Sequence, residues 1–185
     1  MVSIASLWLP IVLSAIVVFL ASAVFHMVLK WHRGDYKKLP NEAAILDAIG
    51  REKVGCGVYM FPHCDPKDAK SPEFKEKMSR GPVGILTMME PGPFNMGKYL
   101  GLWFVYCLIV SVFVAYLTSR TVQSGTDYLA VFRIAGTVAF MGYGIGYFVD
   151  SVWKAQPWSN SIRHMIDGLV YALLTAGVFG WLWVR

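Results

Sequence analysis

The sequence predicts an all-α membrane protein with four transmembrane helices and a small cytoplasmic α+β insertion between the first and second helices. Three observations predict this fold class. Of the 185 residues, 56% are hydrophobic and only 16% are charged, whereas about a quarter of the residues in soluble domains are charged. Four apolar runs are long enough to cross a hydrocarbon core about 30 Å thick. Most of the charge and most of the prolines gather in one stretch, Lys30 to Lys98.

The first apolar run, Leu7 to Leu29, would extend about 35 Å as a helix. No Lys or Arg precedes it, and its apolar character continues past Ala21-Ser22-Ala23, which resembles a cleavage site. We therefore expect a membrane anchor and not a cleaved signal. The other runs are Tyr99 to Leu117, Tyr128 to Val149 and Ile166 to Val184. We expect residues 150–164 to connect the last two runs as a polar turn at one membrane surface.

These runs divide the chain into a first transmembrane segment (residues 1–30), an insertion (residues 31–97) and a three-helix part (residues 98–185). In the insertion, Asn41 is predicted to cap a short helix that extends to Ile49. Gly57 to Pro62 and Val83 to Met89 read as short strands, and the polar piece Ser71 to Ser79 between them is predicted to be helical. A two-stranded ribbon alone is marginal in water. We therefore expect the insertion to lean on the membrane domain or on a partner.

Counting lysine and arginine predicts the orientation, because cytoplasmic loops carry an excess of both. Seven basic residues near the ends of the predicted spans lie on one side of the membrane: Lys30, Arg33, Lys37, Lys38, Lys98, Lys154 and Arg163. Only Arg120 and Arg185 lie on the opposite side of the membrane. We therefore expect a cytoplasmic insertion, with both termini outside. Basic residues beside apolar runs meet anionic lipid headgroups, so the net charge of +5 does not indicate nucleic acid.

The first candidate site lies at the cytoplasmic ends of the predicted spans. This topology places His26, His164, Asp150 and Asp167 on the same membrane side. Two imidazoles and two carboxylates at one depth are residue types that bind a divalent metal or relay protons.

The alternative is that the charged residues there form surface ion pairs. Asp150 with Lys154, and Arg163 with Asp167, have the i,i+4 spacing of helix ion pairs. Asn160 or the serine before it would then cap the last helix.

The second candidate site is His63 with Cys64, close in sequence to Cys56 and His32. Thiolate and imidazole ligands suit copper, zinc or haem iron. No spacing here matches an established site, and C-x-x-C-H is absent. The alternative is a strand that ends at a proline beside a buried cysteine. We therefore predict that the chain binds no cofactor, and a bound metal or haem is the alternative. We also expect phospholipids to contact the predicted spans.

The third apolar run carries a charge and several glycines. Arg133 lies early in the span, where a long guanidinium reaches the interface by snorkelling; the alternative is a pore lining. Gly142 and Gly146 form a G-x-x-x-G pattern that lets another helix approach closely. A potassium-channel filter would need a re-entrant loop, for which the continuous span leaves no room.

Several segments carry a resemblance: Gly81-Pro82-Val83-Gly84, Asn95-Met96-Gly97-Lys98, and the tail from Pro157 to Asn160, through Asp167-Gly168-Leu169, to Phe179 to Trp183. They resemble a group of small bacterial four-span inner-membrane proteins along nearly the whole chain. The resemblance implies a bacterial inner membrane and brings no activity, cofactor or site residue.

Catalytic signatures are absent from the sequence, which contains no nucleophile elbow, Walker-type loop, G-x-G-x-x-G after a strand, or S-x-x-K. We therefore predict a non-enzymatic accessory or scaffold subunit that docks onto a larger membrane complex or self-associates as a homo-oligomer. The first alternative is a homo-oligomeric channel or small transporter lined by Arg133, Asp150 and Asp167. The second is a metal- or haem-linked redox protein that uses His26, His164 or the His63–Cys64 region.

Overall fold

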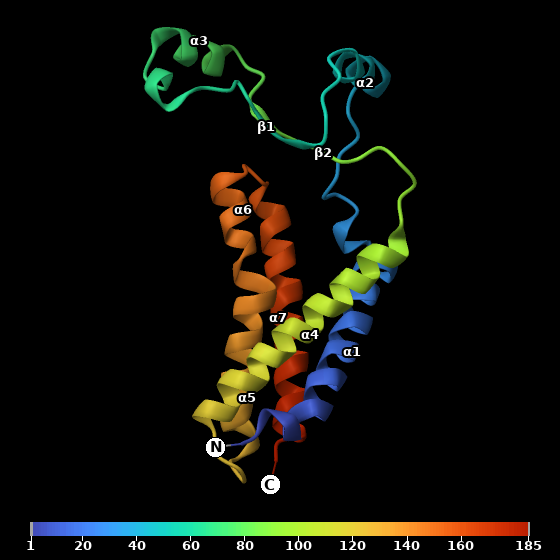
Figure 1. Cartoon of the computed structure of the whole chain (residues 1–185), viewed down its shortest axis with the longest axis vertical. Coiled ribbons are helices and arrows are strands. Elements are labelled where there is room, and N and C mark those ends of the chain that lie inside the picture. The colour runs from blue at the N-terminus through green and yellow to red at the C-terminus, as the bar shows by residue number, and fades with distance from the viewer. Residues whose placement is uncertain (1, 185) are drawn as a thin grey trace. The chain divides into compact units, whose positions relative to one another are not determined.

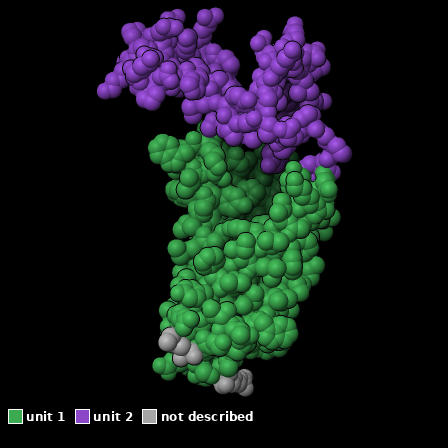
Figure 2. Space-filling view, in the orientation of Figure 1, with its two compact units in different colours: residues 1–35, 95–185 green, residues 36–94 purple. Residues whose placement is uncertain are grey.

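The computed structural model describes residues 2–184, and the chain divides into two compact units (Figure 2). The helical bundle comprises Met1–Asp35 and Asn95–Arg185, and the insertion unit comprises Tyr36–Phe94. Residues 31–35, which the sequence assigns to the insertion, therefore lie with the helical bundle.

Within residues 2–184, four helices are long and apolar enough to span a membrane, which confirms the predicted number. They extend over Ile4–Val28, Met96–Thr121, Tyr128–Trp153 and Trp158–Trp181. Between 22% and 39% of the most apolar part of each helix is buried inside the chain. The remaining apolar surface faces outward, which is the pattern of helices surrounded by lipid or by other helices.

Two of the four helices contain a π-helical turn. The first consists of a 3-10 turn (Ile4–Leu7), α1 (Trp8–Ala23) and a π turn (Val24–Val28). The third consists of α5 (Tyr128–Phe140), a π turn (Met141–Ile145) and α6 (Tyr147–Trp153). The other two, α4 (Met96–Thr121) and α7 (Trp158–Trp181), are continuous α-helices. π turns occur frequently at functional sites.

Helix α7 packs against α1, α5 and α6, while α4 packs against α1 and α5 and crosses the bundle obliquely (Figure 1). The largest fully buried apolar side chains are Leu7, Val18, Val114, Val131 and Phe179. Hydrogen bonds also join the helices. Ser14 Oγ donates to Ser111 Oγ at 2.9 Å, and Trp103 Nε1 donates to Ser22 Oγ at 2.8 Å, both between α1 and α4. Such bonds are typical of helix contacts in an apolar medium.

One close helix contact joins two glycines, Gly144 in the second π turn and Gly168 on α7. A Cβ atom on Gly168 would lie 2.5 Å from the Cα atom of Gly144, so only glycine permits this approach. The predicted packing pair, Gly142 and Gly146, has different surroundings from those of Gly144 and Gly168. A Cβ on Gly142 would lie 3.0 Å from Val110 Cγ1 on α4, whereas a Cβ on Gly146 would meet nothing within 4 Å. Within the chain, Gly142 therefore faces α4, and Gly146 lies at an open surface.

The connection between the last two spans is much shorter than the predicted turn of residues 150–164. Helix α6 continues to Trp153 and α7 begins at Trp158. Asn160 and Ser161, in the first turn of α7, are polar but buried. Asn160 Nδ2 donates to the Asp35 carbonyl, and Ser161 Oγ accepts from Ser151 Oγ. No side chain caps the N-terminus of α7, so the predicted cap is wrong.

The insertion unit contains the helices and strands predicted for it, but the Asn41 side chain makes no capping hydrogen bond, so that predicted cap is wrong. The elements are α2 (Glu42–Arg51), β1 (Gly57–Phe61), a 3-10 turn (Pro66–Asp68), α3 (Pro72–Arg80) and β2 (Gly84–Met88). The two strands are antiparallel, with Gly57 opposite Met88. Ser71 caps α3, since its Oγ accepts a hydrogen bond from the Phe74 N–H at 3.1 Å. No residue from Tyr36 to Phe94 is buried, so this unit has no core of its own.

Candidate functional site

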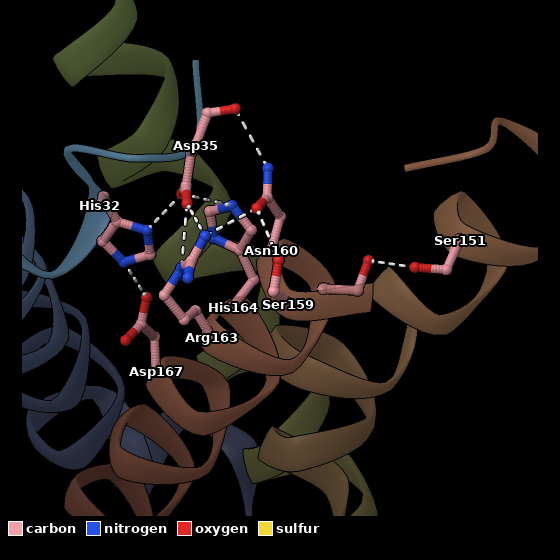
Figure 3. A network of polar contacts seen from close by, with 9 residues as sticks. His32, Asp35, Ser151, Ser159, Asn160, Arg163, His164 and Asp167 are labelled. Atoms are coloured by element: carbon pink, nitrogen blue, oxygen red, sulfur yellow. Dashed lines mark hydrogen bonds and ion pairs between the residues drawn. The ribbon is translucent and has the colours of Figure 1, made fainter. Parts of the chain in front are cut away.

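Five histidine and aspartate residues meet at one end of the helical bundle, and we call them the His32 cluster. They are His26, His32, Asp35, His164 and Asp167. His26 lies in the π turn after α1, and His32 ends a 3-10 turn, Lys30–His32. Asp35 follows in the chain, and His164 and Asp167 lie in the early turns of α7 (Figure 3). The cluster therefore joins segments separated by more than a hundred residues.

His32 is the centre of the cluster, because both of its ring nitrogens face carboxylates. Its Nδ1 atom lies 2.6 Å from Asp35 Oδ2, and its Nε2 atom lies 2.7 Å from Asp167 Oδ2. The rings of His26 and His164 stack with the His32 ring at centroid distances of 4.3 and 4.8 Å. The imidazole side chains therefore lie within contact distance of one another.

Asp35 is held in place from α7. Arg163 donates from Nε and Nη2 to Asp35 Oδ1 at 3.0 and 2.5 Å, and Asn160 Nδ2 donates to the Asp35 carbonyl at 3.1 Å. Burial of this carboxyl raises its pKa, but the hydrogen bonds from His32 and Arg163 outweigh burial and hold the pKa of Asp35 below its usual value. Asp35 is therefore a charged and oriented group.

The predicted ion pair between Arg163 and Asp167 is wrong. Arg163 pairs with Asp35, while Asp167 contacts His32. The i,i+4 spacing favours such a pair on an exposed helix. Here the two side chains instead meet partners from the segment that follows α1, which the local spacing does not reveal.

Asp167 is the most unusual member of the cluster. Its side chain is only 2% exposed. Its Oδ2 atom faces His32, but its Oδ1 atom has no hydrogen-bond partner among the described residues. A buried carboxylate oxygen without a partner costs several kcal/mol, in the range of about 2–7 kcal/mol for a polar group. The orphaned oxygen therefore points to a bound group.

A cavity of about 520 Å³ lies beside the cluster and is lined by residues of all four spans. His26, His164 and Asp167 form its polar part. Both π turns contribute to its wall, through His26 and Tyr143. The cluster is therefore open to a further ligand.

Two groups of three side chains in the cluster have the spacing of metal ligands. One is His26, His32 and Asp167, and the other is His32, Asp35 and His164. In each group the candidate ligand atoms lie within 4.8 Å of one another. Within residues 2–184, groups of this kind occur only in the His32 cluster. Two imidazoles with one carboxylate form a donor set that suits iron, zinc or manganese and leaves coordination positions open.

The other predicted metal ligands lie elsewhere. Asp150 forms the predicted pair with Lys154, at 2.7 Å, and belongs to neither group of three. His63 and Cys64 line a separate cavity of about 380 Å³ in the insertion unit. There the Cys64 thiol contacts the neighbouring Asp65 carbonyl at 3.1 Å. Arg133 is exposed on α5.

Sequence reasoning brought His26, His164 and Asp167 together but missed His32 and Asp35 as members of the same site. A signal for both was present. They follow the first span by a few residues, so the topology that places His26 beside His164 applies to them as well. The charged stretch that begins at Lys30 instead places both residues in the predicted insertion (residues 31–97).

No protein family model matches the chain, and no curated protein or solved structure matches it. The chemistry of the His32 cluster therefore has to be inferred from its own geometry.

Proposed function

We propose that this chain is a multi-pass membrane protein whose function depends on one divalent first-row transition-metal ion bound in the His32 cluster. The ligands are a ring nitrogen of His26, Nε2 of His32 and the carboxylate of Asp167. The observation that carries the proposal is the buried Asp167 side chain, which faces His32 with one oxygen and has no partner within residues 2–184 for the other.

The contact between His32 and Asp167 is one that a metal ion can use. At 2.7 Å, His32 Nε2 and Asp167 Oδ2 must share a proton in the absence of an ion. A metal ion displaces this proton and takes both atoms as ligands, because metal ligands bind in their deprotonated forms. Asp167 Oδ1 then gains a cation beside it.

Asp35 has a supporting role. Metal-bound histidines usually donate their other ring N–H to a carboxylate, which fixes the ring and raises the basicity of the ligand. His32 Nδ1 lies 2.6 Å from Asp35 Oδ2, and Arg163 holds the other oxygen of that carboxylate. Asp35, Arg163 and Asn160 therefore orient His32 for the ion.

The charge of the cluster also favours a cation. It contains two carboxylates, and the only arginine in contact with them is committed to Asp35. Among the described residues, His32 is the only side chain that hydrogen-bonds to Asp167. A buried carboxylate is retained in an apolar helix bundle when it is paired or when it binds a metal.

Location is part of the proposal. The four apolar helices are consistent with a multi-pass membrane protein. The excess of Lys and Arg near His32 and α7 supports a cytoplasmic position for this end of the bundle, and the resemblance of the sequence supports a bacterial inner membrane.

The test is metal titration of the purified, chelator-treated protein with zinc, iron(II) and manganese(II), with the bound metal counted by elemental analysis. We expect one tightly bound ion per chain and its loss in Asp167→Asn. Asp150→Asn is the matched control, because it removes a carboxylate of the same helical hairpin outside the cluster, and it should retain the ion. Equal metal content in wild type and Asp167→Asn would refute the proposal.

A second candidate function, an accessory subunit that docks onto another protein, is favoured by the insertion unit. No residue from Tyr36 to Phe94 is buried, and large apolar side chains such as Val58, Met89 and Phe94 are about 70% exposed. Both strands of its ribbon also have an open edge. Gentle solubilisation from native membrane should then yield a stoichiometric complex with a larger protein, whereas a chain that always purifies alone would contradict this role.

The channel alternative gains less support. Arg133 and Asp150 lie seventeen residues apart in one helical stretch, which corresponds to about 25 Å. Asp150 is paired with Lys154, and Asp167 contacts His32. These three residues therefore do not suggest one continuous path.

A further inference from the structure

The cavity beside the His32 cluster is polar at one end and mainly apolar along the rest of its wall. His26, His164 and Asp167 form the polar end. The rest of the wall consists of aromatic, aliphatic and methionine side chains, apart from Ser22, whose Oγ accepts a hydrogen bond from the indole N–H of Trp103. A ligand that matches this cavity therefore has a polar group at one end and an apolar body behind it.

The cavity extends along the spans for about two helical turns. Its lining covers residues 19–27 of the first span, residues 96–103 of α4 and residues 164–171 of α7. A helical stretch of this length corresponds to about 10 Å. The cavity volume of about 520 Å³ lies within the range of about 300–1,000 Å³ that is usual for small-molecule sites. This shape suits a single slender chain.

The cavity opens at the surface of the bundle between the first span and α4. Met27, Met96 and Leu100 line the cavity, and each of these residues is between 41% and 78% exposed. Methionine side chains are flexible and adapt to ligands of irregular shape. Because the opening is apolar, it admits a ligand from an apolar phase such as a bilayer rather than from water.

The charge of the metal-loaded cluster determines which polar group fits. The charge of Asp35 is balanced by Arg163. Metal-bound imidazoles are neutral, so a divalent ion bound to His26, His32 and Asp167 retains one net positive charge. A buried charge needs a partner, and the ion has open coordination positions. A single negatively charged oxygen ligand meets both requirements, whereas a cationic head group would be repelled.

We propose that this cavity binds a fatty acid, with its carboxylate on the metal ion and its chain along the apolar wall between α1 and α4. This inference rests on the proposed function, because the ion supplies the charge that holds the carboxylate. Carboxylate oxygens are ordinary ligands of zinc and manganese. A fatty acid brings one chain and one negative charge, whereas a phospholipid would bring two chains to a cavity with room for one.

The experiment loads the full chain, in micelles of an uncharged detergent, with cobalt(II), whose visible absorption changes when a ligand binds to the ion. Decanoate, acetate and decanol are then titrated separately. We expect decanoate to change the spectrum saturably at one molecule per chain. Decanol has the same chain without the charge and should leave the spectrum unchanged. Acetate has the head group without the chain, and its half-saturation should require at least about tenfold more ligand.

Two substitutions on α1 isolate the contribution of the chain. Ala23 lines the cavity, so Ala23→Phe should weaken decanoate binding at least about tenfold, as overpacking does, and leave cobalt and acetate binding unchanged. Leu20→Phe is the matched control and should behave as wild type, because Leu20 is 59% exposed and lies outside the cavity lining. Decanoate partitions equally into the micelles of each protein, so a difference between variants reports the cavity. Leu100→Phe, from α4, provides the same test if Ala23→Phe fails to bind cobalt.

The outcomes separate this inference from the proposed function. A wild-type chain that binds no cobalt would refute the proposed function and the inference with it. Bound cobalt whose spectrum responds to no carboxylate, or responds to decanol as it does to decanoate, would overturn the inference and leave the metal site standing. The inference would also be overturned by a decanoate response that Ala23→Phe and Leu100→Phe leave unchanged. A tightly held phospholipid, counted by phosphorus analysis, that decanoate fails to displace would overturn it as well.

Discussion

The two units of the chain contain similar metal-ligating residue types and use them in opposite ways. In the insertion unit, His63, Cys64 and Asp65 are adjacent in sequence, yet their ligand atoms do not form a group of three within metal-ligand distance. In the helical bundle, His32 and Asp167 are far apart in sequence and meet at 2.7 Å.

This difference teaches how such a site arises. Adjacent side chains on a short exposed loop diverge, because nothing holds them against one another. The members of the His32 cluster are held by packing, since α7 lies against α1 and the segment after α1 returns to α7 through Asp35. Convergence of side chains therefore depends on a packed scaffold and not on proximity along the chain.

The largest expected effect is the loss of stability caused by a glycine substitution in the helical bundle. In the bundle, Gly168→Ala would place a Cβ 2.5 Å from the backbone of Gly144, so the helices must separate. We expect a destabilisation at or above about 3 kcal/mol, the upper end of overpacking costs. In the insertion unit, Gly50→Ala in α2 meets nothing within 4 Å and should stabilise by about 0.5 kcal/mol. Thermal unfolding in detergent measures both, and an unaffected Gly168→Ala protein would contradict the close contact.

The next effect concerns the orientation of His32. Asp35→Asn keeps all three proposed metal ligands but removes the carboxylate that faces His32 Nδ1. We expect metal affinity to fall about 10- to 100-fold, the usual effect of losing such a partner. Asp65→Asn in the insertion unit is the control and should leave the affinity unchanged. Competition with a fluorescent chelator gives both constants; equal affinities in Asp35→Asn and wild type would remove Asp35 from the site.

The smallest effects come from two serines that support helices in different ways. Ser71→Ala removes the cap of α3 in the insertion unit, which should cost about 1 kcal/mol and speed hydrogen exchange at the Phe74 amide. Ser14→Ala removes the bond from α1 to Ser111 on α4, which should cost about 0.6 kcal/mol. A double-mutant cycle between Ser14 and Ser111 isolates the second value, and a coupling of zero would show that this bond does not stabilise the bundle.

Local signals were sufficient for most elements of the fold. The apolar runs predict four spans, and Ser71, the glycines and the β-prone residues predict the elements of the insertion unit within a few residues. The polar residues Asn160, Ser161 and Arg163 favour a connector between the last two spans, whereas in the structure they lie in the first turns of α7. In the folded chain these side chains bond to Asp35 and Ser151, so their polarity reports an internal network.

The site was predictable only in part, for a related reason. Span topology brings His26, His164 and Asp167 to the same end of the bundle. The contacts of His32 with Asp167 and of Arg163 with Asp35 join residues 135 and 128 positions apart. No local spacing encodes contacts of that length. They depend on the return of residues 30–35 to α7, which the charged character of that segment does not indicate.

The most direct test of the central claim is X-ray absorption spectroscopy of the zinc-loaded protein, which reports the atoms bound to the ion. The account predicts a shell of nitrogen and oxygen ligands at about 2.0–2.2 Å with the outer-shell scattering of imidazole rings, lost in Asp167→Asn. A sulfur ligand at about 2.3 Å would place the ion on a cysteine and contradict the account. A shell without imidazole scattering would contradict it as well.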